Sequence, residues 1–214
     1  MPRIRLVAII ATYAVVGTLY AIYTPTWQIP DEPAHYNYIR QLAEGQGLPV
    51  MEMGDYDQAY LDRLRGTKFP PELSIESVTY EDHQPPLYYL LATPVYVLFG
   101  GQVVPLRLLS VVFGAALLAA VFGVVQAVFP ARPVLALVAA ALIAFIPQHV
   151  AMTAGVNNDT LAELVLAVTL WMLVVYLRGG HERPWPIGLA LAAALLTKGL
   201  IYIAVPVVVV GVAI

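Results

Sequence analysis

The residues best suited to chemistry follow the first apolar stretch of the chain, in the segment Pro-Asp-Glu-Pro-Ala-His at residues 30–35. Asp31 and His35 are four residues apart, so in a helix they share one face. There they can share a proton, a metal ion or a substrate hydroxyl, as a general base and its orienting partner do. The alternative is a helix N-terminus, where Asp31 or the neighbouring Glu32 complements the helix dipole. The spacing alone leaves both interpretations open.

Two further polar clusters follow along the chain. His83 precedes Pro85 and Pro86, which hold the backbone extended and fix the direction of the imidazole. The alternative for this cluster is a solvated loop that leads into an interfacial helix. Asn158 and Asp159 begin an apolar run, where such residues accept hydrogen bonds from free helix N–H groups. They are equally suited to binding a sugar or positioning a base.

Single charged residues near or within the apolar runs are also candidates. Lys198 needs an anionic partner such as a lipid phosphate, unless its side chain snorkels to the interface. Arg107 is either a second such cation or an interfacial anchor. Glu163 lies inside an apolar run, where an ionisable group is a functional candidate. We expect structural or cytoplasmic positions for His149 and His181 and give them no catalytic role.

Evidence for a cofactor is weak. His35 and His83, with the carboxylates of Asp31, Glu32 or Glu81, offer ligands that suit several transition metals. No compact ligand motif is present, so a divalent metal ion stays an open addition. No P-loop, dinucleotide fingerprint or G-x-S-x-G motif occurs, and without cysteine there is neither a disulfide framework nor a thiolate metal site.

The elements that must position these residues are membrane helices. Apolar residues make up 60% of the 214 residues and charged residues only 12%, whereas soluble domains have roughly 25% charged residues. The composition predicts an all-α, polytopic helical membrane protein, folded as a single transmembrane module over residues 1–214. Most acidic residues lie between Asp31 and Asp82. This acidic segment argues against nucleic acid as a partner.

Arg3 and Arg5 precede the first span, residues 6–24, which we expect to be a retained anchor. They predict a cytoplasmic N-terminus and an extracytoplasmic loop over residues 25–84. Within that loop, apolar residues at helical spacing predict two amphipathic helices, at 31–44 and 55–65. We expect these helices to lie at the membrane surface, over the outer ends of the spans.

The remaining apolar runs set the topology. We expect spans at 105–129, 133–155 and 160–177, followed by an interrupted apolar stretch at 186–214. Residues 85–101 are tyrosine-rich and barely long enough to cross. If they do not cross, Arg132, Arg178 and Arg183 fall on the cytoplasmic side, as the positive-inside rule favours. We therefore predict a juxtamembrane or shallow helix at 85–101, which puts Asp31, His83, Arg107 and Asp159 at one membrane face.

The polar clusters, in this order, resemble those of the GT-C superfamily of membrane glycosyltransferases, of the protein mannosyltransferase and aminoarabinose transferase type. Residues 30–33 are similar to the D-E motif of its first outer loop, and residues 83–89 to its (H/K)-x-P-P-L-(Y/W) segment. Residues 107–110 resemble its R-L-x-S, and residues 196–199 its L-T-K-G. The likeness extends over about residues 25–199.

The resemblance implies an inverting sugar transfer from a polyprenyl-phosphate donor to an acceptor hydroxyl at the outer face. Asp31 matches the family's catalytic carboxylate, and Asp159 an acidic position of the second outer loop that serves the acceptor or a metal. Cations then stabilise the departing lipid phosphate. The expected catalytic residues are Asp31, Glu32 and Asp159. The expected substrate-binding residues are His35, His83, Arg107, Asn158 and Lys198.

Two other functions remain open. Members of the family are usually longer, so we expect the chain to be a fragment or a shortened homologue. A non-catalytic subunit of a larger membrane complex is therefore the main alternative, with other membrane subunits as partners and small-residue stretches for helix packing. A transporter or flippase is less favoured, because the ionisable groups gather at one face rather than at the bilayer midplane.

Overall fold

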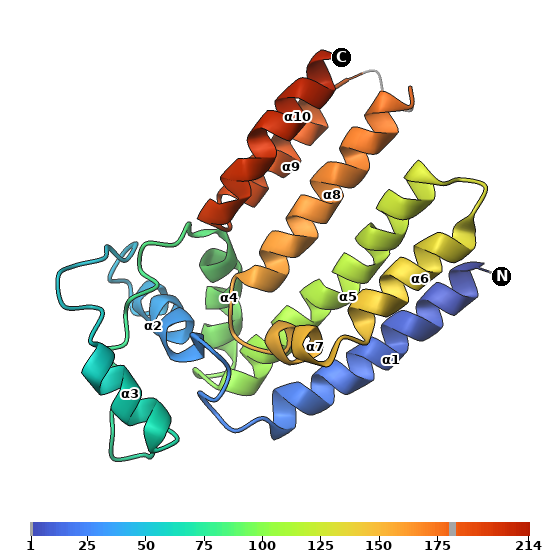
Figure 1. Cartoon of the computed structure of the whole chain (residues 1–214). Helices are drawn as coiled ribbons and strands as arrows, with labels where there is room; N and C mark the ends of the chain where they lie inside the picture. The colour runs from blue at the N-terminus through green and yellow to red at the C-terminus, as the bar shows by residue number, and fades with distance from the viewer. Residues whose placement is uncertain (1, 180–182) are drawn as a thin grey trace.

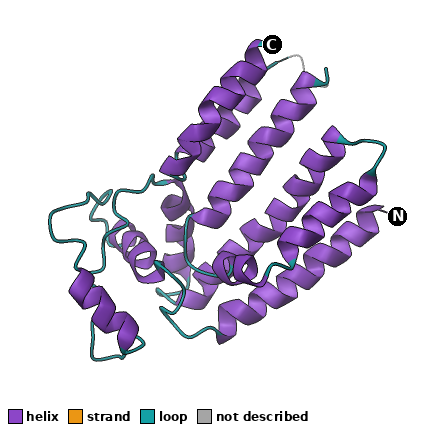
Figure 2. Ribbon diagram, viewed as in Figure 1, coloured by secondary structure: helices purple, strands orange, loops and turns teal. Residues whose placement is uncertain are grey.

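The computed structural model describes residues 2–179 and 183–214, so the predicted role of His181 lies outside the described residues. Within this part the chain folds into helices joined by loops, without strands (Figure 2). The prediction of an all-α helical membrane protein is confirmed. The helices are α1 (Pro2–Tyr23), α2 (Glu32–Ala43), α3 (Gln58–Gly66), α4 (Leu87–Leu98), α5 (Val103–Val128), α6 (Pro133–Ala144), α7 (Pro147–Thr153), α8 (Asp159–Leu177), α9 (Trp185–Leu195), the 3₁₀-helix η1 (Gly199–Ile203) and α10 (Ala204–Ala213).

Among the described residues, three helices are long and apolar enough to cross a bilayer: α1 with 22 residues, α5 with 26 and α8 with 19. They coincide closely with three of the predicted spans. The predicted span at 133–155 is interrupted, because α6 and α7 are separate helices bent by 69°; together they are apolar enough to form a broken span or a re-entrant loop. Pro147 begins α7, and a proline lacks the N–H that a continuous helix needs at that point.

Two other apolar stretches do not form long straight helices. Helix α4 has 12 residues, which at 1.5 Å per residue reach about 18 Å, well short of a hydrocarbon layer of about 30 Å. It packs against α2, and the juxtamembrane or shallow position of residues 85–101 stays a prediction. The stretch at 186–214 folds back on itself, and α9 and α10 both pack against α8 (Figure 1).

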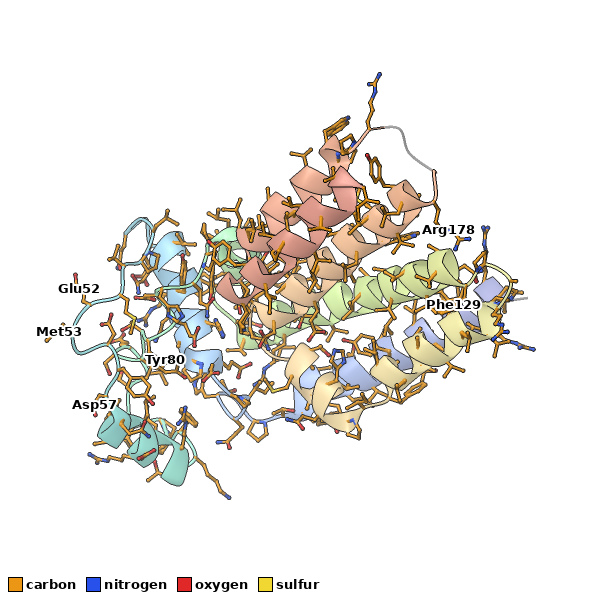
Figure 3. All side chains as sticks on the ribbon, turned by 45° about the horizontal axis from the view of Figure 1, so that its top comes forward. Glu52, Met53, Asp57, Tyr80, Phe129 and Arg178 are labelled. Carbon is orange, nitrogen blue, oxygen red and sulfur yellow. The ribbon has the colours of Figure 1, made fainter. Side chains whose placement is uncertain are left out.

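The bundle has two chemically different ends (Figure 1). The start of α1, the loop between α5 and α6 and the end of α8 lie at one end. There Nη1 of Arg178 donates to the carbonyls of Ala127 and Val128, at 2.6 and 3.0 Å, and joins α8 to α5. Figure 3 labels Arg178 beside Phe129 in this region. Helices α2, α3, α4 and α7 and the start of α8 lie at the opposite end.

Small residues bring the long helices together. Gly114 of α5 leaves no room for a Cβ, because the ring of Tyr13 from α1 fills that space. Tyr13 is buried and donates to Oγ1 of Thr153 in α7 at 2.8 Å. Gly123 of α5 accommodates the indole of Trp171 from α8 in the same way. Close backbone approach at small residues is the usual way in which membrane helices pack.

The helices of the first loop bury their apolar faces inside the protein. Tyr38 and Ile39 of α2 lie in a core with Tyr89 of α4, and the rings of Tyr38 and Tyr89 stack with centroids 3.6 Å apart. Leu61 and Leu64 of α3 form a second cluster with residues from the end of the loop. The loop is therefore a packed cap whose start and end are held against the bundle.

Candidate functional site

A buried ion pair fixes the start of α2 against the bundle. Nε of Arg107, from α5, donates to Oε1 of Glu32 at 2.7 Å, and Nη2 donates to Oε2 at 2.6 Å. The two side chains are only 2% and 0% exposed. This two-pronged geometry is the strong form of an arginine–carboxylate contact.

The same two side chains also bind the backbone of neighbouring segments. Arg107 donates to the carbonyls at the end of α1, namely those of Ala21, Thr24 and Pro25. Glu32 accepts from the N–H of Trp27 at 3.0 Å and from that of Val156 at 3.2 Å. The pair therefore joins α1, α2, α5 and the segment before α8.

Asp31 directly precedes this anchor and has a left-handed backbone, with φ 62° and ψ 0°. Aspartate tolerates this conformation better than most residues. Its carbonyl accepts from the N–H groups of Ala34 and His35 at 3.1 Å each, and its carboxylate accepts from the hydroxyl of Tyr80 at 2.7 Å. Burial, together with the hydrogen bond to Asp31, raises the pKa of Tyr80, so this phenol keeps its proton. Oδ1 of Asp31 is thus held in place by Tyr80.

His35 turns into the protein interior. Its Nδ1 lies 2.8 Å from the hydroxyl of Tyr89 in α4, and the side chain is buried. Burial lowers the pKa of His35 to about 4, so the ring is neutral near pH 7. The nearby charges include those of Asp31, Asp159 and Lys198. His35 therefore lies among the site residues without lining any of the hollows described below.

The start of α8 and the end of α9 meet through polar side chains. Nζ of Lys198 donates to Oδ1 of Asp159, and the two side chains are 21% and 41% exposed. Beside them, the buried amide of Asn158 donates to the carbonyl of Thr197 at 3.0 Å and to Oε1 of Gln84 at 3.2 Å. Asn158 therefore ties three segments together, while the Lys198–Asp159 pair remains open to solvent.

A hollow of about 270 Å³ lies beside Lys198 and is also lined by His83, Gln84 and Tyr202. Nδ1 of His83 donates to the carbonyl of Tyr80 at 3.0 Å. Because the proton is then on Nδ1, Nε2 is left to accept or to bind a ligand. This hollow, which we call the Lys198 hollow, contains an ammonium and an imidazole and so suits an anionic group.

A second hollow, also of about 270 Å³, lies beside Asp31. Trp27, Phe69 and Tyr80 supply aromatic walls, and Arg65 of α3 supplies a cation. Figure 3 labels Tyr80 where α2 and α3 face each other. We call this space the Asp31 hollow.

Two more carboxylates complete the electrostatics of this end. Burial raises the pKa of Glu81, whose charge interacts with those of Asp31, His83 and Lys198. Burial also raises the pKa of Asp82 to about 6, although a hydrogen bond from Gln41 opposes the shift. Burial is the largest cause of both shifts, so both carboxyl groups keep a proton to higher pH than exposed ones would.

The structure brings all eight predicted site residues to one end of the bundle. Asp31, Asp159, His83 and Lys198 line hollows. Glu32, Arg107, His35 and Asn158 are buried in contacts with other protein groups. The eight are thus divided between residues that a ligand can reach and residues that hold the site together.

Several residues of this end are not among the predicted site residues. Tyr80 is one of them, and Arg65, which ends the predicted helix at 55–65, is another. His149 is a third, yet its Nε2 lies 2.8 Å from Oε2 of Glu163, and both side chains line a third hollow together with Asp159. Two signals in the sequence could have indicated this contact. His149 closely follows the helix-breaking Pro147, and Glu163 lies one turn into an apolar run.

The described residues include no group of three or more histidine, aspartate or glutamate side chains arranged to hold a metal ion. The divalent ion that the sequence left open stays a prediction.

Comparison with known proteins gives one match. The model of the dolichyl-phosphate-mannose-protein mannosyltransferase family matches residues 83–214, which is more than half of the chain and includes His83, Arg107, Asn158, Asp159 and Lys198. No curated protein and no solved structure matches. Asp31 and Glu32 lie outside the matched residues, but their contacts with Tyr80 and Arg107 connect them to the site. The chain belongs to the dolichyl-phosphate-mannose-protein mannosyltransferase family.

Proposed function

We propose that the protein transfers a sugar from a polyprenyl-phosphate donor to an acceptor hydroxyl at the outer face of the membrane. The family uses donors of this kind. The observation that carries the proposal is the pairing of an anchored carboxylate, Asp31, with a cationic hollow, lined by Lys198 and His83, at the same end of the bundle. Such an arrangement offers a base that can take the acceptor's proton and a positive charge that can stabilise the leaving phosphate.

In the proposed reaction Asp31 accepts the proton of the acceptor hydroxyl as its oxygen attacks the anomeric carbon. The new bond joins the acceptor oxygen to this carbon. The bond between the anomeric carbon and the phosphate oxygen breaks, and the electron pair leaves with the polyprenyl phosphate. Tyr80 holds one carboxylate oxygen of Asp31, and the other oxygen is the one that takes the proton.

Charge builds up on the phosphate as it leaves, so a fixed cation is most useful there. We assign this role to Lys198 with His83. The ammonium of Lys198 binds Asp159, and we propose that the donor phosphate replaces this carboxylate. Asp159 then becomes free to bind the sugar or the acceptor.

Glu32 and Arg107 receive a positioning role. All five guanidinium N–H groups of Arg107 lie on protein acceptors, through Glu32 and the carbonyls at the end of α1. A lipid phosphate would have to displace these contacts to reach the guanidinium. Glu32 directly follows Asp31 in the chain. We therefore propose that the Glu32–Arg107 pair sets the direction of the Asp31 carboxylate.

A Lys198→Gln variant is expected to bind the donor about 10- to 100-fold more weakly, because a hydrogen bond to a charged group contributes about 1.5–3 kcal/mol. The measurement is binding of a short-chain polyprenyl phosphate to the protein in nanodiscs. Lys68→Gln removes an exposed lysine and serves as the charge-matched control. Asp159→Asn should bind the lipid at least as tightly as the parent does, since it releases Lys198. Unchanged affinity in Lys198→Gln would remove Lys198 from the donor site.

The orientation can be tested by thiol labelling, because the chain has no cysteine. In intact cells, a membrane-impermeant maleimide should label a Ser77→Cys variant, in the first loop, and should leave an Ala131→Cys variant unlabelled until the cells are permeabilised. Both positions are exposed. The reverse pattern would place the site at the cytoplasmic face and rule out the proposed orientation.

Catalysis by the chain itself is tested by single-turnover release of polyprenyl phosphate from a radiolabelled donor, with the purified protein alone in nanodiscs. Release that needs an added membrane subunit would favour the non-catalytic alternative.

A further inference from the structure

The Asp31 hollow has walls of three chemical kinds. Trp27, Phe69 and Tyr80 are aromatic, Asp31 is a carboxylate and Arg65 a cation. At about 270 Å³ it lies near the lower limit for ligand sites, roughly 300–1,000 Å³. It is therefore suited to one ring-sized head group.

Unusual backbone conformations gather around this hollow. In the described part of the chain, the non-glycine residues with positive φ are Trp27, Asp31, Lys68 and Phe69. Trp27, Asp31 and Phe69 line the hollow, and Lys68 adjoins Phe69. Left-handed residues other than glycine cost free energy and tend to persist at functional sites. Three separate turns of the chain therefore adopt this costly conformation around the same hollow.

The cation of the hollow is available to a ligand. Arg65 is exposed, and no carboxylate of the described residues pairs with its guanidinium. It is near enough to Tyr80 to oppose the rise in the pKa of that phenol. Tyr80 in turn donates to Asp31. A ligand between Arg65 and Asp31 can therefore meet a cation at one side and a carboxylate at the other.

The Asp31 hollow is separate from the Lys198 hollow, although the segment 80–84 contributes to both. The side chain of Tyr80 lines the first, and the side chains of His83 and Gln84 line the second. If the donor phosphate occupies the Lys198 hollow, the molecule whose proton Asp31 takes can occupy the Asp31 hollow, which Asp31 lines. Inverting transfer needs this arrangement, because nucleophile and leaving group stand on opposite sides of the anomeric carbon.

We propose that the Asp31 hollow binds the acceptor and that it selects a hydroxyl compound with an anionic group, a phosphate or carboxylate, held by Arg65. This inference rests on the proposed function. The guanidinium of Arg65 offers two parallel N–H donors to such an anion, the aromatic walls cover the apolar side of the head group, and Asp31 receives the hydroxyl. The anion can belong to a lipid head group or to a soluble compound.

The charge of the hollow can be measured without knowing the acceptor. A single cysteine at Gln28, an exposed residue that lines the hollow, reports on it. In a Gln28→Cys chain we compare the labelling rates of an anionic and a cationic methanethiosulfonate reagent at low salt. Adding Arg65→Gln should lower the anionic-to-cationic rate ratio by about 5-fold or more, since nearby charges act strongly within a Debye length. Arg63→Gln removes the same charge from the same helix and should change the ratio less than about 2-fold.

A protection experiment tests selection. Glycerol 3-phosphate should slow labelling of the Gln28→Cys chain, whereas glycerol should not, and Arg65→Gln should remove the protection. Equal effects of the two compounds, or protection that survives Arg65→Gln, would overturn the proposal. Nanodiscs of phosphatidylglycerol and of phosphatidylcholine then identify the source. Slower labelling in phosphatidylglycerol that Arg65→Gln abolishes assigns the anion to a lipid, whereas a difference between the two lipids that Arg65→Gln leaves unchanged assigns it to a soluble acceptor.

These measurements use neither donor nor transfer, so their failure is distinct from a failure of the proposed function. An unchanged rate ratio in Arg65→Gln overturns the acceptor site and leaves Asp31 as the proposed base. Full activity of an Asp31 variant would overturn the base and leave anion binding at Arg65 intact.

Discussion

An Asp31→Asn variant is expected to fold normally and to transfer sugar about 10²- to 10⁴-fold more slowly, which is the usual contribution of a general base. Asparagine adopts the left-handed backbone of this position readily and its oxygen can still accept from Tyr80. The variant loses the negative charge of Asp31 and with it the ability to take a proton. The measurement is single-turnover release of polyprenyl phosphate, together with the thermal unfolding temperature of the purified protein.

The control for Asp31→Asn is Glu72→Gln, which neutralises an exposed carboxylate of the same loop. It should leave both the transfer rate and the unfolding temperature unchanged. If Asp31→Asn kept the parent's rate, Asp31 would not be the base, and Glu81, whose charge interacts with that of Asp31, would be examined next.

An Arg107→Met variant is expected to be destabilised by about 3–5 kcal/mol, because it leaves the carboxylate of Glu32 buried without its counter-ion. The carbonyls at the end of α1 lose their donors as well. The measurement is the midpoint of thermal or denaturant unfolding in detergent. A double variant, Glu32→Gln with Arg107→Met, should be less destabilised than the sum of the two single variants, since it leaves no unpaired charge.

The matched control is Arg40→Met, which breaks an exposed pair with Glu76 at 3.4 Å. Exposed pairs contribute about 0–1 kcal/mol, so this variant should unfold close to the parent. If Arg107→Met were equally well tolerated, the pair would not anchor the start of α2. That result would favour a role of Arg107 in binding substrate over the positioning role.

The long helices could be predicted from the sequence because hydropathy measures the property that a bilayer requires of them. The common end of Asp31, His83 and Asp159 was expected from charge counting along the chain, and the structure places the three residues at one end of the bundle. These predictions depended on single properties, hydropathy for the spans and charge for the polar end.

Side-chain pairing could not be predicted in this way. Glu32 and Arg107 are 75 positions apart, and nothing local in the sequence indicates that each is the partner of the other. Both were therefore assigned to chemistry, as single charges near a membrane suggest. The pairing of Lys198 with Asp159 was hidden for the same reason, since it depends on how α9 folds back along α8.

The broken helix shows a different limit. Residues 133–155 are apolar enough for a span, and mean hydropathy is insensitive to one missing N–H. The bend at Pro147 turns α7 aside and places His149 opposite Glu163. A local backbone rule, applied before the apolar average, would have indicated this break.

The segment 80–84 supplies side chains to both hollows, and this has a kinetic meaning. Under the proposed function, donor and acceptor occupy different hollows, so neither has to leave before the other arrives and a ternary complex can form in either order. The segment 80–84 then separates the binding spaces of the two substrates.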